Sequence, residues 1–190
     1  MKNIAIFASG EGTNAQKIID HFRQSARGRV SLVVCNKPGA GVLRRAEQAN
    51  VPVLMINRSS FYESDEVIRH LHSNNIDLIV LAGFLWMIPA DLIQAFPEKI
   101  INIHPALLPK FGGKGMYGMN VHKAVIDSAE KQSGITIHFV NENYDEGKII
   151  AQHTCYITSL DTFETLAEKI HELEHRYYPQ TIEKALEIIR

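Results

Sequence analysis

The first 103 residues contain five short, largely apolar runs, and helical patterns lie between them. The runs cover residues 3–8, 30–35, 52–56, 77–82 and 100–103. Runs of this length are typical of strands buried on both faces of a parallel sheet. Parallel neighbours need a crossover, usually a helix, so the alternation predicts right-handed βαβ units. We therefore predict an α/β fold with a Rossmann-like, mostly parallel sheet and helices on both faces.

Beyond residue 130 the pattern changes from alternation to two strands followed by one long helix. The runs 134–140 and 148–157 predict an antiparallel extension of the sheet in the C-terminal half. A long helix is expected to begin at Thr162, and Pro179 is expected to kink or divide it. Its expected apolar face contains Leu166, Ile170, Leu173 and Tyr177. The other expected helices cover residues 15–22, 42–49, 62–73, a stretch beginning at 89, and 121–129 capped by Asn120.

Composition excludes several classes of protein. The net charge is -1 and the basic residues are scattered, so neither a nucleic-acid surface nor an anionic membrane surface is expected. The longest uncharged apolar run, 78–90, is shorter than the about 20 residues needed to cross a bilayer. No signal-peptide pattern precedes the first strand, so we expect a cytoplasmic location. No metal-ligand spacing is present, and Cys35 and Cys155 are expected to be reduced.

Residues 9–14, Ser-Gly-Glu-Gly-Thr-Asn, join the first strand to the first helix. Glycines let the backbone approach a ligand, and a helix N-terminus offers free N–H groups, so this loop predicts an anion site, most naturally for phosphate. Gly12, Thr13 and Asn14 are its candidate ligands. The same glycines match a dinucleotide fingerprint, which leaves open a nicotinamide-dependent oxidoreductase or a nucleotide-binding sensor. A tight turn capped by Thr13 is the purely structural alternative.

The fifth apolar run ends in Asn102-Ile103-His104-Pro105. Period-2 alternation puts Asn102 and His104 on one face of the strand, and Pro105 ends the ladder. An amide and an imidazole held side by side are suited to stabilising and protonating an oxyanion. Asp145 lies in a polar turn before Gly147. If it folds back onto His104, it would favour the imidazolium form.

These polar segments are expected to share one site. In parallel sheets ligands bind at the carboxyl ends of the strands, where the 9–14 loop, the region of Gly83 and the pair Asn102 and His104 all lie. The large apolar residues that follow Gly83 either line a flat aromatic pocket or fill the core. The glycine-rich stretch 111–119 is expected to be a surface loop.

With these motifs in view, the chain resembles the phosphoribosylglycinamide formyltransferase family across nearly its whole length. The matching segments are residues 9–14, 81–84, 102–109, 121–124, 138–140, 145–147, 174–175 and 178–179. The resemblance implies a folate-dependent enzyme that transfers the formyl group of 10-formyltetrahydrofolate to glycinamide ribonucleotide, without a metal. It also implies one domain over 1–190, with a phosphate-binding half (1–100) and a catalytic, folate-binding half (101–190).

The resemblance implies a role for individual residues. Catalysis is assigned to Asn102, His104 and Asp145. The substrate is bound by Gly12, Thr13, Asn14 and Glu174. The folate cosubstrate is bound by Leu85, Trp86, Met87, Ile88, Asn102, Asn141, Glu142, Asn143, Tyr144 and Asp145. Relatives often have basic residues near the positions of Ser64 and Trp86, and neither residue is basic here.

Two alternatives keep the formyl donor and change the acceptor. One is transfer to another amine, such as methionyl-tRNA or a sugar nucleotide, and the other is hydrolysis of formyltetrahydrofolate. Such enzymes usually carry an additional domain, for which 190 residues leave no room, and the chain lacks the basic surface expected for tRNA. We therefore expect only small-molecule partners, and a monomer or homodimer.

Overall fold

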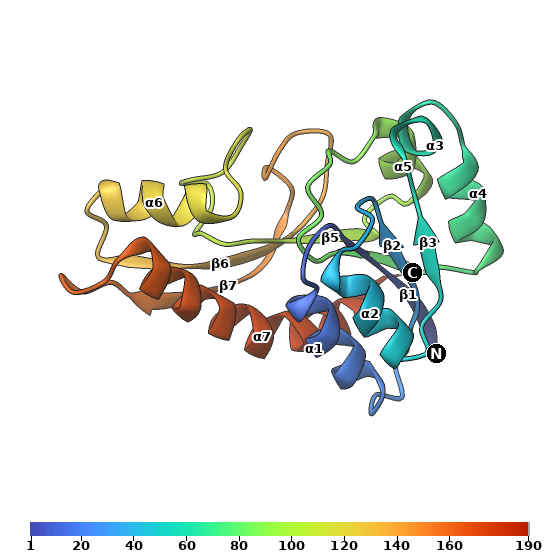
Figure 1. Ribbon diagram of the computed structural model, residues 1–190, viewed down its shortest axis with the longest axis horizontal. Coiled ribbons are helices and arrows are strands. Elements are labelled where there is room, and N and C mark those ends of the chain that lie inside the picture. The colour runs from blue at the N-terminus through green and yellow to red at the C-terminus, as the bar shows by residue number, and fades with distance from the viewer. Residues whose placement is uncertain (190) are drawn as a thin grey trace.

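The computed structural model describes residues 1–189 and forms one seven-stranded sheet (Figure 1). The strands are β1 (Lys2–Ala8), β2 (Gly28–Cys35), β3 (Val53–Met55), β4 (Leu78–Leu81), β5 (Ile100–His104), β6 (Gln132–Phe139) and β7 (Ile149–Tyr156). Their order across the sheet is β3-β2-β1-β4-β5-β6-β7. The first five strands pair in parallel, whereas β6 is antiparallel to β5 and β7 to β6. The predicted fold class is confirmed.

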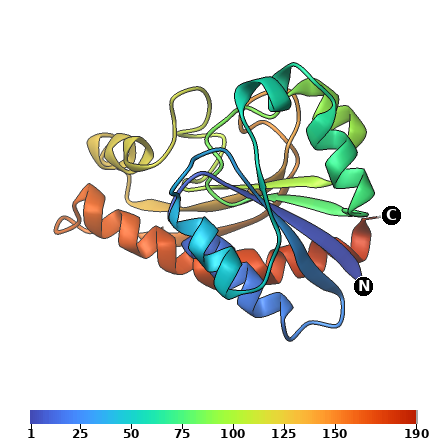
Figure 2. The same ribbon diagram turned by 45° about the vertical axis from the view of Figure 1, so that its right-hand side comes forward.

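Helices cover both faces of the sheet (Figure 2). One face carries α1 (Thr13–Phe22), α2 (Gly41–Gln48), α6 (Met119–Asp127) and α7 (Phe163–Ile188). The other carries α3 (Arg58–Tyr62), α4 (Glu66–Ser73) and α5 (Ala90–Ala95). Because strand side chains alternate between faces, Ile6 packs in the first core cluster and its neighbour Phe7 in the second. None of the helices in the described chain is long and apolar enough to cross a membrane.

The predicted helix over 62–73 is wrong, because the chain forms two shorter helices there. α3 begins earlier, at Arg58, where Asn57 and Ser60 form a reciprocal capping box. The helix then breaks before α4, and the Ser64 hydroxyl occupies the break. It donates to the carbonyl of Ser60 and accepts from the N–H of Glu66. Side-chain bonds to the backbone thus replace helical bonds at this point.

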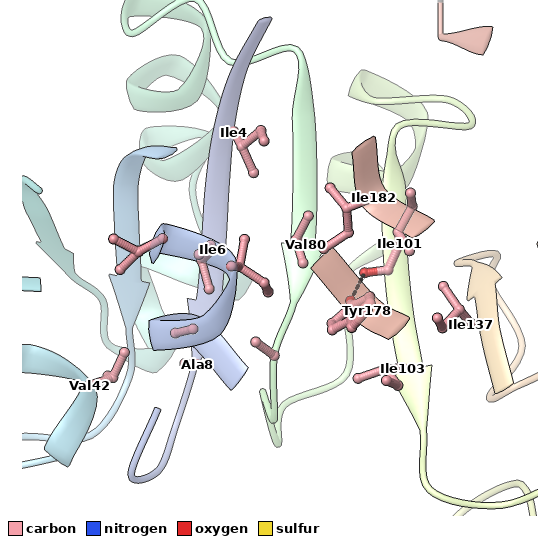
Figure 3. Close-up of a cluster of buried hydrophobic side chains, with 14 of the residues drawn as sticks. Ile4, Ile6, Ala8, Val42, Val80, Ile101, Ile103, Ile137, Tyr178 and Ile182 are labelled. Carbon is pink, nitrogen blue, oxygen red and sulfur yellow. Dashed lines mark hydrogen bonds between the residues drawn. The ribbon is translucent and has the colours of Figure 1, made fainter. Parts of the chain in front are cut away.

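The long helix α7 is continuous through Pro179, so the expected division does not occur. Its buried face is also rotated relative to the prediction: Tyr178 is fully buried, whereas Tyr177 is only half-buried. The Tyr178 hydroxyl hydrogen is shared between the carbonyl oxygens of Leu81 (2.9 Å) and Ile101 (3.2 Å). Figure 3 shows Tyr178 beside Ile101, with a dashed line for its hydrogen bond to the Ile101 carbonyl. Packing of this face against β4 and β5 outweighs the hydrogen bond that a helical proline removes.

The helix after the glycine-rich loop begins two residues earlier than predicted. Its first residue is Met119, and Gly118, with φ 55°, takes the N-cap position that was expected for Asn120. The Asn120 side chain instead bonds to the carbonyl of Gly115, 3.4 Å away. Glycine is suited to this position because it has no Cβ that would clash with the backbone at a left-handed φ.

Candidate active site

A cavity of about 850 Å³ lies at the carboxyl ends of the central strands, and we call it the main cavity. It is lined by the loop after β1, the segment after β4, the end of β5, the glycine-rich loop, the turn after β6 and one side of α7. All the site residues predicted from the sequence line it except Glu142, which is exposed and lies outside the lining. The predicted convergence of these segments is therefore confirmed.

The anion loop leaves the N-terminus of α1 open. Gly12 has a left-handed φ of 73°, and a Cβ there would lie 2.7 Å from the Cβ of Val42, so only glycine fits. No side chain caps α1, and the alternative in which Thr13 is its cap is wrong. The free N–H groups of the first helical turn are thus available to an anion in the main cavity.

Beside this loop, Asn14 and Glu174 form a buried polar pair. Asn14 Nδ2 donates to Glu174 Oε2 at 2.8 Å, and Glu174 is only 6% exposed. Burial raises the pKa of this carboxyl above its usual value, and the Asn14 bond opposes that rise. Asn14 Oδ1 is buried without a partner among residues 1–189. A buried acceptor of this kind calls for a ligand N–H or O–H group.

Three histidines that the sequence analysis did not assign also line this end of the cavity: His122 on α6, and His171 and His175 on α7. Within the described residues, His122 Nδ1 and His175 Nε2 are buried without hydrogen-bond partners. Burial, and then the nearby His171 and His104, lower the pKa of His122 to about 4. His171, Glu174 and His175 have i, i+3, i+4 spacing, which places them on one face of α7. This spacing is the signal in the sequence that could have revealed the polar face.

At the centre of the cavity, the β5–β6 register places His138 directly opposite Asn102. His138 Nδ1 lies 2.9 Å from the carbonyl oxygen of Phe139, which can only accept, so this nitrogen carries the proton. His138 Nε2 then accepts from Asn102 Nδ2 at 3.2 Å. The Asn102 amide is thereby oriented, and its second N–H is left for a ligand. This role of His138 was not predicted from the sequence.

His104 and Asp145 lie together, so the condition that the sequence left open is met. His104 Nδ1 lies 3.5 Å from Asp145 Oδ2, and His104 Nε2 donates to the carbonyl of Phe111 at 2.8 Å. Burial lowers the pKa of His104 by more than Asp145 and the Phe111 carbonyl raise it, so the expected imidazolium is not the resting form. Burial also acts to raise the pKa of Asp145. The neighbouring His138 and His104 rings and the bond from the Gly113 N–H outweigh it, so the pKa of Asp145 is lowered.

The loops around this centre are fixed by residues distant in sequence. Gly113 N donates to Asp145 Oδ2 at 2.9 Å, which ties the glycine-rich loop to the predicted catalytic carboxylate. The buried Thr136 hydroxyl donates to the carbonyl of Ala106 and accepts from the N–H of Leu108. Gln152 Nε2 completes this group by donating to Thr136 and to the carbonyl of Leu108. The strands β6 and β7 therefore hold the segment that follows His104.

The opposite end of the cavity is apolar and open. Leu85, 62% exposed, and the exposed Met87 and Tyr144 present apolar surface there, while Ile88 is buried beneath them. Leu85 N donates to Ser9 Oγ at 3.0 Å, so this wall is attached to the start of the anion loop. Within the described residues, no cluster of three or more His, Cys, Asp or Glu side chains is arranged to hold a metal ion.

Comparison with known proteins agrees with this geometry. The profile of the family described as "Formyl transferase" matches residues 2–182, so the chain belongs to the formyl transferase family. Within that family it groups with the phosphoribosylglycinamide formyltransferases. The Bacillus subtilis enzyme of that name is 39% identical over 193 residues, which cover 98% of this chain and 95% of the relative. The resemblance found in the sequence motifs is confirmed.

Solved structures give the same grouping. The crystal structure of glycinamide ribonucleotide transformylase 1 from Geobacillus kaustophilus has a TM-score of 0.89 and 39% identity, covering 98% of this chain and 99% of that one. The chloroplastic phosphoribosylglycinamide formyltransferase of Arabidopsis thaliana is 44% identical over 95% of this chain. The chain spans 64% of that relative's length and 61% of the Vigna unguiculata one.

Proposed function

We propose that the chain transfers the formyl group of 10-formyltetrahydrofolate to the amine of glycinamide ribonucleotide, in de novo purine biosynthesis. The observation that carries this proposal is the position of Asn102 and His104 between a polar end of the main cavity, at the N-terminus of α1, and an apolar end. A phosphorylated ribose with a reactive amine matches the first end. A flat aromatic donor matches the second, and the two substrates would meet at the oxyanion pair.

The acceptor would be held by two kinds of group. The N–H groups of Gly12, Thr13 and Asn14 would bind its phosphate at the positive end of α1. Asn14 and Glu174 both line the main cavity, and their side-chain oxygens can accept hydrogen bonds from ribose hydroxyl groups. The donor would lie on Leu85, Trp86, Met87 and Ile88, against Asn141, Asn143 and Tyr144 from the turn after β6.

In catalysis, Asn102 and His104 would stabilise the negative charge that develops on the formyl oxygen as the substrate amine attacks. Donors aimed at such charge are commonly worth ~3–4 kcal/mol each. The neutral His104, whose Nε2–H donates to Phe111, would take a second proton at Nδ1 from the attacking amine. The protonated ring would place positive charge beside the oxyanion, and its Nδ1 faces Asp145 Oδ2. Such an imidazolium is acidic enough to pass a proton towards the departing folate nitrogen, directly or through a water held by Asp145.

The direct test is an assay with the purified chain, 10-formyltetrahydrofolate and glycinamide ribonucleotide. We expect free tetrahydrofolate and formylated ribonucleotide to appear in equal amounts, and the dephosphorylated ribonucleoside to be a much poorer acceptor. Release of tetrahydrofolate without an acceptor would instead identify a formyltetrahydrofolate hydrolase. Tight NAD(P) binding with no folate binding would identify a nucleotide-binding oxidoreductase or sensor.

Four statements about the whole protein stay predictions from the sequence. They are the single domain over 1–190 with its phosphate-binding and catalytic halves, the monomeric or homodimeric state, the absence of macromolecular partners and the cytoplasmic location.

A further inference from the structure

A second, smaller cavity of about 420 Å³ adjoins the apolar end of the main cavity, and we call it the side cavity. It is formed where β2 and β3 end and α3 begins, and Trp86 lines both cavities. A ligand group that lies against Trp86 in the main cavity is therefore next to the side cavity. None of the roles proposed above uses this second space.

Arg58 is the cationic side chain of the side cavity. Its guanidinium carbon lies 5.2 Å from the centre of the Trp86 ring, a cation–π contact. Arg58 is exposed, and no carboxylate of residues 1–189 lies within ion-pair distance of it. An arginine held by an aromatic ring, with all its donors available, is suited to binding a ligand carboxylate in a fork.

The wall that carries Arg58 is fixed. The capping box of Asn57 and Ser60 sets the start of α3, where Arg58 is the first helical residue. Tyr62, one turn later, donates through its hydroxyl to the carbonyl of Met87 at 2.9 Å. This bond ties α3 to the same segment that carries Trp86. The fold therefore sets where the Arg58 side chain starts relative to the apolar wall, and the contact with Trp86 positions its guanidinium.

The chemical groups of the formyl donor in the proposed reaction match the two cavities in kind and in order. Its pteridine and benzoyl rings are flat and largely apolar, and its far end is a glutamate with two carboxylates. We propose that Arg58 binds a glutamate carboxylate of the donor, and that Trp86 packs against the benzoyl ring between the two cavities. This inference rests on the proposed function and assigns the donor's acidic tail to a residue of this chain. Ser64 and Trp86 are uncharged and cannot supply the cation.

The test uses Trp86, the only tryptophan of the chain, as a fluorescent reporter of binding. Tetrahydrofolate and the methyl amide of tetrahydropteroate, which has neither the glutamate nor any carboxylate, are titrated into the wild-type chain, Arg58→Met and Arg58→Lys. We expect Arg58→Met to weaken tetrahydrofolate binding about five- to tenfold, with less difference at high salt. The methyl amide should bind the wild type and Arg58→Met equally, and Arg58→Lys should recover part of the loss.

Arg44→Met is the matched control, because Arg44 is an exposed arginine on α2 that lines neither cavity. It should bind both ligands as the wild type does. Equal weakening of both ligands in Arg58→Met, or no weakening of either, would overturn the inference. If the wild type binds tetrahydrofolate but does not formylate glycinamide ribonucleotide, the proposed function is wrong. The comparison of Arg58→Met with the wild type then still tests whether Arg58 binds the glutamate. A wild-type chain that binds no tetrahydrofolate overturns both.

Discussion

The two ends of the main cavity are built from opposite kinds of surface. At the acceptor end, Asn14, His122 and His175 hold buried polar atoms without partners in the described chain, beside the buried Glu174. At the donor end, apolar side chains such as Leu85 are exposed to water. Unpaired buried polar atoms cost free energy until a ligand pairs with them, so the acceptor end is selective. Exposed apolar surface contributes instead by leaving water when the donor binds.

The two ends also differ in how rigidly their binding groups are held. The acceptor end draws its groups from α1, α6 and α7, which pack together through one buried core cluster. The donor end draws on the segment after β4 and on the turn after β6. Hydrogen bonds require fixed partners, whereas apolar contacts are non-directional and tolerate variation. We therefore expect substitutions at the acceptor end to cost more than those at the donor end.

The largest effect is expected where the two ends meet. His104→Ala should lower kcat by at least about 100-fold, because it removes both an oxyanion donor and the proposed acid. Asp145→Asn should lower kcat as well, because it removes the charge that stabilises protonated His104. Steady-state kinetics with both substrates measures this, and thermal unfolding checks the fold. Turnover near the wild-type rate in His104→Ala would contradict the mechanism.

The second effect is on the free energy of unfolding, and it tests how much stability is lost by burying His122 at the acceptor end. The pKa of His122 is about 4 in the folded chain and 6.5 when the side chain is exposed, so between these values the unfolded chain binds more protons. Stability therefore rises with pH across this window and falls on acidification, by at most roughly 3 kcal/mol from this residue. His122→Gln should flatten the dependence of the unfolding free energy between pH 7 and 5. An unchanged slope would show that His122 is not buried as described.

The third effect concerns acceptor binding alone. Asn14→Ala removes the 2.8 Å bond to Glu174 and the free Oδ1. The KM for glycinamide ribonucleotide should rise about tenfold or more, as expected for a lost bond to a charged or buried group, with little change in the KM for the donor. Initial rates with each substrate varied in turn separate the two. An equal rise in both constants would show that the ends are not independent.

The smallest effect is expected at the donor end. Leu85→Ala shortens an exposed side chain and should raise the KM for 10-formyltetrahydrofolate only about two- to fivefold, because little apolar area is lost. The KM for the acceptor should stay as in the wild type. If Leu85→Ala costs as much as Asn14→Ala, the contrast between a selective end and an adaptable end is wrong.

The sequence by itself determined the features that depend on local pattern. Alternating apolar runs and helical patterns predicted the parallel sheet, because burial on both faces demands continuous apolar strands. The Gly12 loop and the pair Asn102 and His104 were also readable, since strand periodicity and helix termini place such groups without reference to distant residues. The carboxyl-end rule then placed them in one cavity.

Only the tertiary structure decided the features that depend on burial and distant contacts. The resting state of His104 is one, because the burial that lowers its pKa comes from the packed fold and outweighs the charge of Asp145. The orientation of Asn102 by His138 needs the β5–β6 register. The continuity of α7 through Pro179 depends on the packing of Tyr178 beneath β4 and β5. Local pattern carries no information about what packs against a residue, and that packing sets its charge, partners and backbone path.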